Sequence, residues 1–168
     1  MITSVRIVGA GLIGTSVALA LKAEGVEVEV IDQDSAAQML ARDLVQATSI
    51  ENPEVILLAL PVSQIFEVLQ AESSLYPNSI LMDVGSTKSE LQVKVDELSE
   101  VRQRFVGTHP MAGREVSGPT AARADLFVGR AWPVIKSTYT SSDAIEKARE
   151  VIALCGATAY EMSAESHD

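Results

Sequence analysis

The chain has 168 residues, a formal net charge of -10 and a single cysteine, Cys155. This length allows one good hydrophobic core, and the acidic balance without a basic run argues against nucleic acid and anionic membrane surfaces as partners. One cysteine excludes a disulfide within the chain, and its apolar surroundings predict a buried structural thiol. A cytoplasmic location fits this composition.

Strand-like and helix-like segments alternate along the chain. Apolar runs predict strands at 4–8, 26–31, 54–60, 79–84, 105–108, 131–135 and 158–162. Amphipathic or capped segments predict helices at 12–23, 36–44, 62–70, 89–98 and 143–154, with Ser35 as a candidate cap of the second helix. Pro133 indicates an edge strand or a strand start. Residues 45–53 are turn-like with room for a short strand, and residues 111–129 form a long loop with at most one helical turn. The alternation predicts an α/β fold with a doubly wound, mostly parallel sheet.

The first strand leads into a glycine motif, G-x-G-x-x-G, at residues 9–14. Gly9 permits a tight turn, Gly11 lets the backbone approach a pyrophosphate, and Gly14 lets helix and strand pack closely. Leu12 and Ile13 open the helix whose N-terminus would face the phosphates. Asp32 ends the next strand, eighteen residues past the last glycine, where a carboxylate can bind ribose hydroxyls. Since the next residues are Gln33 and Asp34 rather than an arginine, NAD is favoured over NADP as the cofactor.

Polar and small residues follow four further strands. Ligands of such sheets bind beyond the carboxyl ends of the strands. We therefore expect one edge of the sheet, called the rim below, to bring together the glycine motif, Asp32, Pro61, Gly85, Ser86 and His109. His109 is a candidate general base, because a neutral imidazole can accept a proton from a substrate hydroxyl. Ser86 is its natural orienting partner. Lys88 could contact phosphate or lie at the surface, and His167 alone predicts no role. No cluster of Cys, His and carboxylate has metal-ligand spacing, so we expect no metal.

These motifs, in their order, resemble the prephenate/arogenate dehydrogenase family of tyrosine biosynthesis. The resemblance covers the whole chain and rests on the glycine motif together with the segments Asp83-Val84-Gly85-Ser86-Thr87-Lys88, Gly107-Thr108-His109-Pro110-Met111-Ala112-Gly113, Ser117-Gly118-Pro119, Ala124-Asp125-Leu126-Phe127 and His167-Asp168. The glycine motif is shared by all Rossmann-like NAD-binding domains. The G-S-x-K and G-x-H-P-M-A-G segments, about twenty residues apart, are much more specific.

The resemblance implies an oxidative decarboxylation. NAD accepts a hydride from the ring carbon that bears the hydroxyl of prephenate or arogenate, CO2 leaves, and 4-hydroxyphenylpyruvate or tyrosine forms. In the family, the histidine matching His109 accepts the hydroxyl proton, and the serine matching Ser86 bonds both histidine and substrate. The acid matching Glu115 lies near the substrate entrance. Arg114 departs from the small or polar residue often found there, and it could contact a substrate carboxylate.

The family continues past the His167-Asp168 pair into a helical domain that dimerises and supplies further substrate contacts. The resemblance therefore implies a dinucleotide-binding domain over 1–162. Residues 163–168 would be the start of a connection to the helical domain, and the full-length form would be a homodimer. We expect the present chain to bind NAD but to turn over poorly alone, because it offers few cations for two substrate carboxylates.

Two other functions remain open at this point. The first is another NAD(P) dehydrogenase of the 3-hydroxyacid type, in which the catalytic lysine lies on the helical domain and Ser86 and His109 are incidental. The second is a non-catalytic module that senses NAD. Replacing His109 by asparagine separates both from the prephenate/arogenate interpretation, which predicts a loss of rate.

Overall fold

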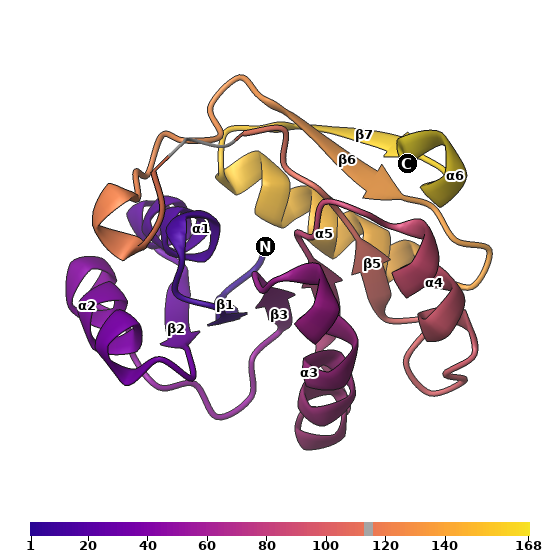
Figure 1. The fold of residues 1–168 in the computed structure, drawn as a ribbon, viewed down its shortest axis with the longest axis horizontal. Helices are drawn as coiled ribbons and strands as arrows, with labels where there is room; N and C mark the ends of the chain where they lie inside the picture. Colours follow the sequence, from indigo (N-terminus) through magenta and orange to yellow (C-terminus); the bar gives the residue numbers. More distant parts are fainter. Residues whose placement is uncertain (113–115) are drawn as a thin grey trace.

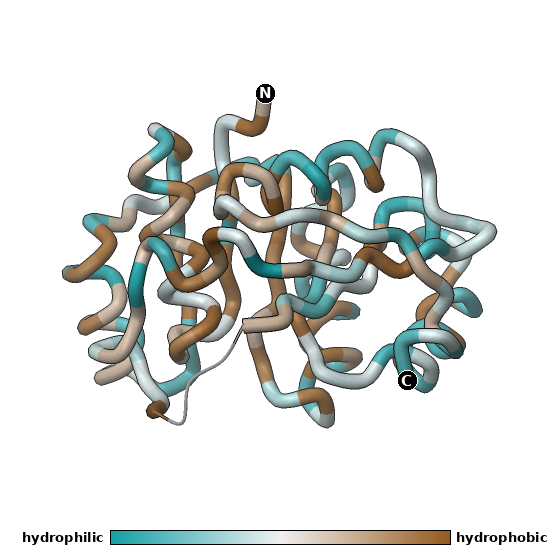
Figure 2. The backbone as a smooth tube through the Cα atoms, turned by 90° about the horizontal axis from the view of Figure 1, so that it is seen from above, coloured by the Kyte–Doolittle hydropathy of each residue, from teal (hydrophilic) through white to brown (hydrophobic). Residues whose placement is uncertain are grey.

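The central sheet consists of five parallel strands: β1 (Ser4–Val8), β2 (Glu27–Ile31), β3 (Val55–Leu58), β4 (Ile80–Asp83) and β5 (Phe105–Gly107). The computed structural model describes residues 1–112 and 116–168. The strands lie in the order β2-β1-β3-β4-β5. Every residue of β3 and β4 is buried, and the hydrophobic segments of the strands pass through the middle of the molecule (Figure 2). Continuous apolar runs of this kind are typical of parallel strands covered on both faces.

Helices cover both faces of this sheet (Figure 1). One face carries α1 (Leu12–Ala23), α2 (Ser35–Val45) and α5 (Ser142–Leu154), which share one hydrophobic core. The other carries α3 (Val62–Leu75) and α4 (Ser89–Asp96), which share a second core. The doubly wound α/β fold expected from the sequence is therefore confirmed. Within the described residues, no helix is long and apolar enough to cross a membrane.

The last two strands stand apart from the central sheet. β6 (Ala131–Ile135) and β7 (Thr158–Met162) pair in parallel as a two-stranded sheet. An antiparallel bridge between Thr108 and Val134 connects them to the chain that leaves β5. Next to it, the backbone N–H of His109 donates to the carbonyl of Pro133 at 3.1 Å. The small sheet therefore holds the segment that carries His109.

Two short helices complete the chain. The 3-10 helix η1 (Pro119–Ala121) lies in the long connection before β6, as the single helical turn expected there. The helix α6 (Ala164–His167) follows β7 and lies beside α4 and β6 at the C-terminus (Figure 1).

Several predicted boundaries need correction. Asp34, not Ser35, caps α2, because its Oδ1 accepts the amides of Ala36 and Ala37 at 3.0 and 3.1 Å. The helix α3 continues to Leu75 instead of ending at 70. No strand forms over 45–53 in the described structure. These differences concern helix ends and a connecting segment, where local sequence patterns are least decisive.

Candidate functional site

The glycine motif forms a tight turn between β1 and α1. Gly9 has φ +116°, and a Cβ there would lie 2.0 Å from the carbonyl oxygen of Ala59. A Cβ on Gly14 would lie 2.0 Å from the carbonyl oxygen of Gly9. Around Gly11, in contrast, nothing lies within 4 Å of the position that a Cβ would take. The outer glycines are therefore required by the fold, whereas Gly11 leaves open space beside the loop.

The N-terminus of α1 faces that space. Leu12 and Ile13 form its first turn, and no side chain caps the helix. The first amides of a helix have no partner within the helix, and the helix dipole is positive at this end. The turn lies between β1 and β3, where the strand order reverses, and ligands of open parallel sheets bind at that crevice. An anionic ligand such as a pyrophosphate fits this position.

The carboxylate of Asp32 lies at the side of the glycine turn. Its Oδ2 accepts the amide of Ala10 at 2.7 Å, and its Oδ1 accepts the amide of Asp34 at 2.8 Å. Its own backbone amide donates to Gln38 Oε1 at 2.8 Å. Each carboxylate oxygen has two lone pairs, so these contacts fix the group while leaving acceptor capacity for ribose hydroxyls.

Pro61 and Gly85 follow the neighbouring strands β3 and β4. Pro61 is exposed and directly precedes α3. Gly85 is buried, and its amide donates to Asp83 Oδ2 at 2.9 Å. A Cβ on Gly85 would lie 2.8 Å from Ile65 Cδ1. The structure thus places both residues on the rim that also carries the glycine turn, and their contact with a cofactor stays a prediction.

Lys88 is buried, in contrast to both roles considered for it from the sequence. It is 2 % exposed, and its Nζ donates to Asp83 Oδ2 and, at 2.6 Å, to the carbonyl of Thr108. The Thr108 hydroxyl donates to the carbonyl of Asp83 and accepts from Trp132 Nε1. This network joins the end of β4 to the end of β5. It fixes the backbone one residue before His109, and it removes Lys88 as a partner for phosphate.

His109 points its Nδ1 toward a second histidine. The atoms His109 Nδ1 and His167 Nε2 are 3.0 Å apart, and the rings meet edge to face with centroids 5.1 Å apart. His167 Nδ1 lies 2.8 Å from Asp168 Oδ1. The two histidines are 58 positions apart in the chain, so local sequence patterns gave no sign of this contact. The side chain of His167 is only 4 % exposed, so it is packed against its neighbours rather than left in solvent.

The surroundings of His109 lower its pKa below the usual 6.5. Partial burial is the largest cause, and the neighbouring side chains of His167 and Lys88 add to it, while Asp83 opposes them. The imidazole is therefore neutral at pH 7 and able to accept a proton.

The remaining predicted site residues are placed only in part. Ser86 follows β4 on the same rim and is exposed, and its hydroxyl has no hydrogen-bond partner within the described residues. The Nδ1 of His109 binds His167 rather than Ser86. The role of Ser86 therefore stays a prediction that concerns a bound substrate. Arg114 and Glu115 lie outside the described residues.

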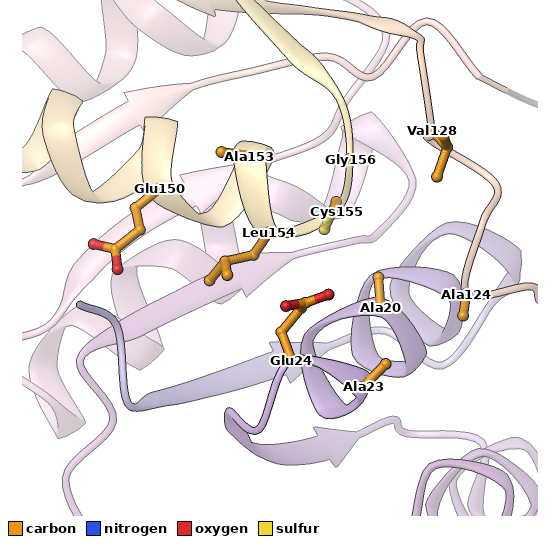
Figure 3. Close-up of a pocket in the computed structure, with 10 residues that line it drawn as sticks. All are labelled: Ala20, Ala23, Glu24, Ala124, Val128, Glu150, Ala153, Leu154, Cys155 and Gly156. Carbon is orange, nitrogen blue, oxygen red and sulfur yellow. The ribbon is translucent and has the colours of Figure 1, made fainter.

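A separate pocket lies at the opposite end of α1 (Figure 3). Because α1 has twelve residues, it separates this pocket from the glycine turn by about 18 Å. The lining consists mostly of small apolar side chains with two acids, Glu24 and Glu150. Cys155 also borders it, and burial raises the pKa of its thiol to about 12. This thiol is a structural group rather than a nucleophile.

Within the described residues, no group of three or more His, Cys, Asp or Glu side chains is arranged to hold a metal ion. The residues that could hold an organic cofactor lie on the rim, and they are the glycine turn, Asp32 and the loops after β3 and β4.

Comparisons with known proteins agree with this geometry. Residues 17–161 match the family model of the prephenate dehydrogenase nucleotide-binding domain. The chain is 35% identical over 165 residues to the probable prephenate dehydrogenase NovF of Streptomyces niveus, covering 96% of this chain and 46% of that protein. The chain spans about half the length of the curated prephenate dehydrogenases it matches.

Two solved structures have the same fold over nearly the whole chain. Prephenate dehydrogenase of Aquifex aeolicus, determined with hydroxyphenyl propionate and NAD+, is 26% identical with a TM-score of 0.90, covering 99% of this chain and 62% of that one. Arogenate dehydrogenase of Synechocystis is 25% identical with a TM-score of 0.89, covering 98% and 61%. The chain belongs to the prephenate dehydrogenase family and corresponds to its nucleotide-binding domain.

Proposed function

We propose that the chain binds NAD in the crevice between β1 and β3. The open space at Gly11 and the uncapped start of α1 accept the pyrophosphate. Asp32 takes the adenosine ribose hydroxyls, and the acids Asp32 and Asp34 repel the 2′-phosphate of NADP. The Aquifex relative, whose structure holds NAD+, supports this choice of cofactor.

The reaction that fits the site best is oxidative decarboxylation of prephenate or arogenate. Bound NAD supplies a hydride acceptor for the ring carbon that carries the hydroxyl, and the ring carboxylate leaves as CO2. The observation that carries this proposal is the placement of His109 on the same rim as the glycine turn, with its Nδ1 3.0 Å from His167 Nε2.

His109 takes the hydroxyl proton as the hydride leaves, which makes a ring ketone of the alcohol. When CO2 leaves, the electron pair of the broken C–C bond enters the ring, and the phenolic oxygen takes a proton back. His109 therefore returns to its neutral form and no net proton is consumed. Ser86, which is exposed on the same rim, donates to or accepts from the substrate hydroxyl and keeps it aligned.

Substrate carboxylates need cationic partners, and the described rim offers few of them. Lys88 is buried against Asp83 and Thr108, so it cannot reach a substrate. Arg130 is exposed on the loop before β6. We therefore expect Arg114, and cations of a helical domain in the longer relatives, to bind the carboxylates, and we expect slow turnover by the chain alone.

The test measures two quantities for the chain and its variants. These are the affinity for NAD and the rate of NADH formation at 340 nm, with prephenate and arogenate in parallel reactions. The His109→Asn variant should bind NAD with unchanged affinity and lose at least about tenfold in rate. Unchanged turnover by this variant would contradict the role of His109. A readout without turnover is the binding of hydroxyphenyl propionate to the NAD complex, which should shift the ring resonances of His109. The larger rate among the two substrates identifies the natural one.

A further inference from the structure

The side chains of Asp168, His167 and His109 are linked in series by hydrogen bonds. Asp168 Oδ1 lies 2.8 Å from His167 Nδ1, and His167 Nε2 lies 3.0 Å from His109 Nδ1. Each ring nitrogen can donate or accept, depending on the tautomer. The donor-to-acceptor direction of these hydrogen bonds therefore decides whether the other nitrogen of His109, its Nε2, carries a proton.

The contacts of Asp168 fix that direction. Its Oδ1 accepts the amide of Lys88 at 2.9 Å, and its Oδ2 accepts the amide of Ser89 at 2.9 Å. These amides begin α4, which has no cap of its own, so the helix dipole also favours a negative charge here. The hydrogen bond from His167 and those from the two amides hold the pKa of Asp168 well below its usual range. An ionised carboxylate can only accept, so His167 Nδ1 donates.

The donor or acceptor role of each remaining ring nitrogen follows from this. A neutral imidazole that donates through Nδ1 accepts through Nε2. His167 Nε2 therefore accepts, and His109 Nδ1 donates to it. This leaves the lone pair of His109 on Nε2, which has no hydrogen-bond partner within the described residues.

We propose that His167 and Asp168 are positioning residues that hold His109 as the Nδ1–H tautomer, with its basic Nε2 toward the substrate. The kinetic part of this proposal rests on the proposed function, whereas the tautomer itself does not. The burial of the His167 side chain, at 4 % exposure, excludes water as a competing partner. The short helix α6 thus contributes to the site by fixing the proton on the base rather than by touching the substrate.

The tautomer can be measured directly, because His109 and His167 are the only histidines in the chain. We would label the histidine ring nitrogens with 15N and record long-range 1H–15N correlations of the whole chain at about pH 8. A His167→Gln variant assigns the two rings. The proposal predicts that His109 carries its proton on Nδ1 in the unmodified protein. A proton on Nε2 of His109, or a free mixture of both tautomers, would overturn it.

Asp168→Ala removes the carboxylate that accepts from His167 Nδ1. The donor and acceptor nitrogens of His167 are then no longer fixed, so His109 is no longer held as one tautomer. We expect a mixture of both His109 tautomers and a fall of about twofold or more in the rate of NADH formation, with unchanged NAD affinity.

A matched control is Asp143→Ala on α5. Asp143 is 68 % exposed and lies 3.7 Å from Lys147, one helical turn away. This variant should leave both the tautomer and the rate unchanged. An Asp168→Ala protein that keeps His109 wholly in the Nδ1–H tautomer would contradict the proposal. If the tautomers behave as expected while His109→Asn stays fully active, the proposed function fails and the positioning contact stands.

Discussion

The two halves of the candidate site are built in different ways. The glycine turn consists of backbone from one continuous segment, and its shape follows from Gly9 and Gly14, where a side chain would collide with backbone at 2.0 Å. The His109 half consists of groups from β4, the loop before α4, the end of β5 and the C-terminal segment after β7. These groups contact each other across separations of up to 80 positions in the chain. Local sequence therefore encodes the first half, whereas tertiary packing assembles the second.

This difference leads to opposite sensitivities to mutation. In the glycine turn, added volume is the damaging change, because the backbone has no room for it. In the His109 half, loss of a charged or polar partner is the damaging change, because the groups left behind are buried.

The largest effect should come from Lys88→Met. Its Nζ is buried against Asp83 and the Thr108 carbonyl, so the variant leaves a buried carboxylate without its cation. We expect a loss of about 3–5 kcal/mol in the free energy of unfolding, measured by chemical denaturation. Lys94→Met, on the exposed face of the same helix, is the control and should cost under about 1 kcal/mol. Adding Asp83→Asn to Lys88→Met should recover part of the loss. A Lys88→Met protein as stable as the unmodified one would contradict the network.

Gly14→Ala and Gly11→Ala should separate folding from binding within one turn. At Gly14 the new methyl group collides with the Gly9 carbonyl, so we expect a loss of stability of about 2–3 kcal/mol. At Gly11 the methyl group meets nothing within 4 Å, so stability should be unchanged. NAD affinity should nevertheless fall about tenfold or more, because the methyl group occupies the space for the pyrophosphate. Equal effects of both variants on stability would show that the turn has no open side.

Asp32→Asn tests the choice of cofactor. Loss of the negative charge weakens the hydrogen bonds from the ribose hydroxyls, and bonds to charged groups contribute about 1.5–3 kcal/mol. We expect NAD affinity measured by calorimetry to fall about tenfold, while the ratio of NADP to NAD affinity rises. Asp34→Asn, which keeps a capping side chain on α2, is the matched control for NAD. The hypothesis is wrong if Asp32→Asn binds NAD as tightly as the unmodified chain.

The smallest effect concerns pH. The pKa of His109 is lowered by burial and by His167 and Lys88, against the effect of Asp83. Deprotonated His109 is the active form, so the acid limb of kcat/KM should have its midpoint below pH 6.5. A lowered folded-state pKa also means that the unfolded chain binds more protons below pH 6.5, so stability present above that pH is lost as the pH falls. A midpoint of the acid limb of kcat/KM above pH 6.5 would contradict a lowered pKa of His109.

The same contrast explains which features the sequence could predict. The five central strands, the helices on both faces and the glycine turn follow from periodicity and from residues within a few positions of each other. The burial of Lys88 and the contact between His167 and His109 could not be predicted from the sequence. Both depend on how β4, β5 and α6 meet in the fold. The only signal was that both residues belong to the motifs shared with the family. The separation of β6 and β7 from the main sheet is likewise a consequence of packing. The positions of Arg114 and Glu115 lie outside the described residues, and their roles stay predictions.

The most direct test of the account is whether one ligand connects the two halves of the site. We would titrate the chain with NAD, follow binding by calorimetry, and record the ring resonances of the two histidines at each addition. The account predicts that NAD binds, that NADP binds at least about tenfold more weakly, and that the resonances of His109 shift and saturate with the same affinity. Absence of NAD binding, or NAD binding that leaves His109 unchanged, would contradict the claim that the glycine turn and His109 form one site.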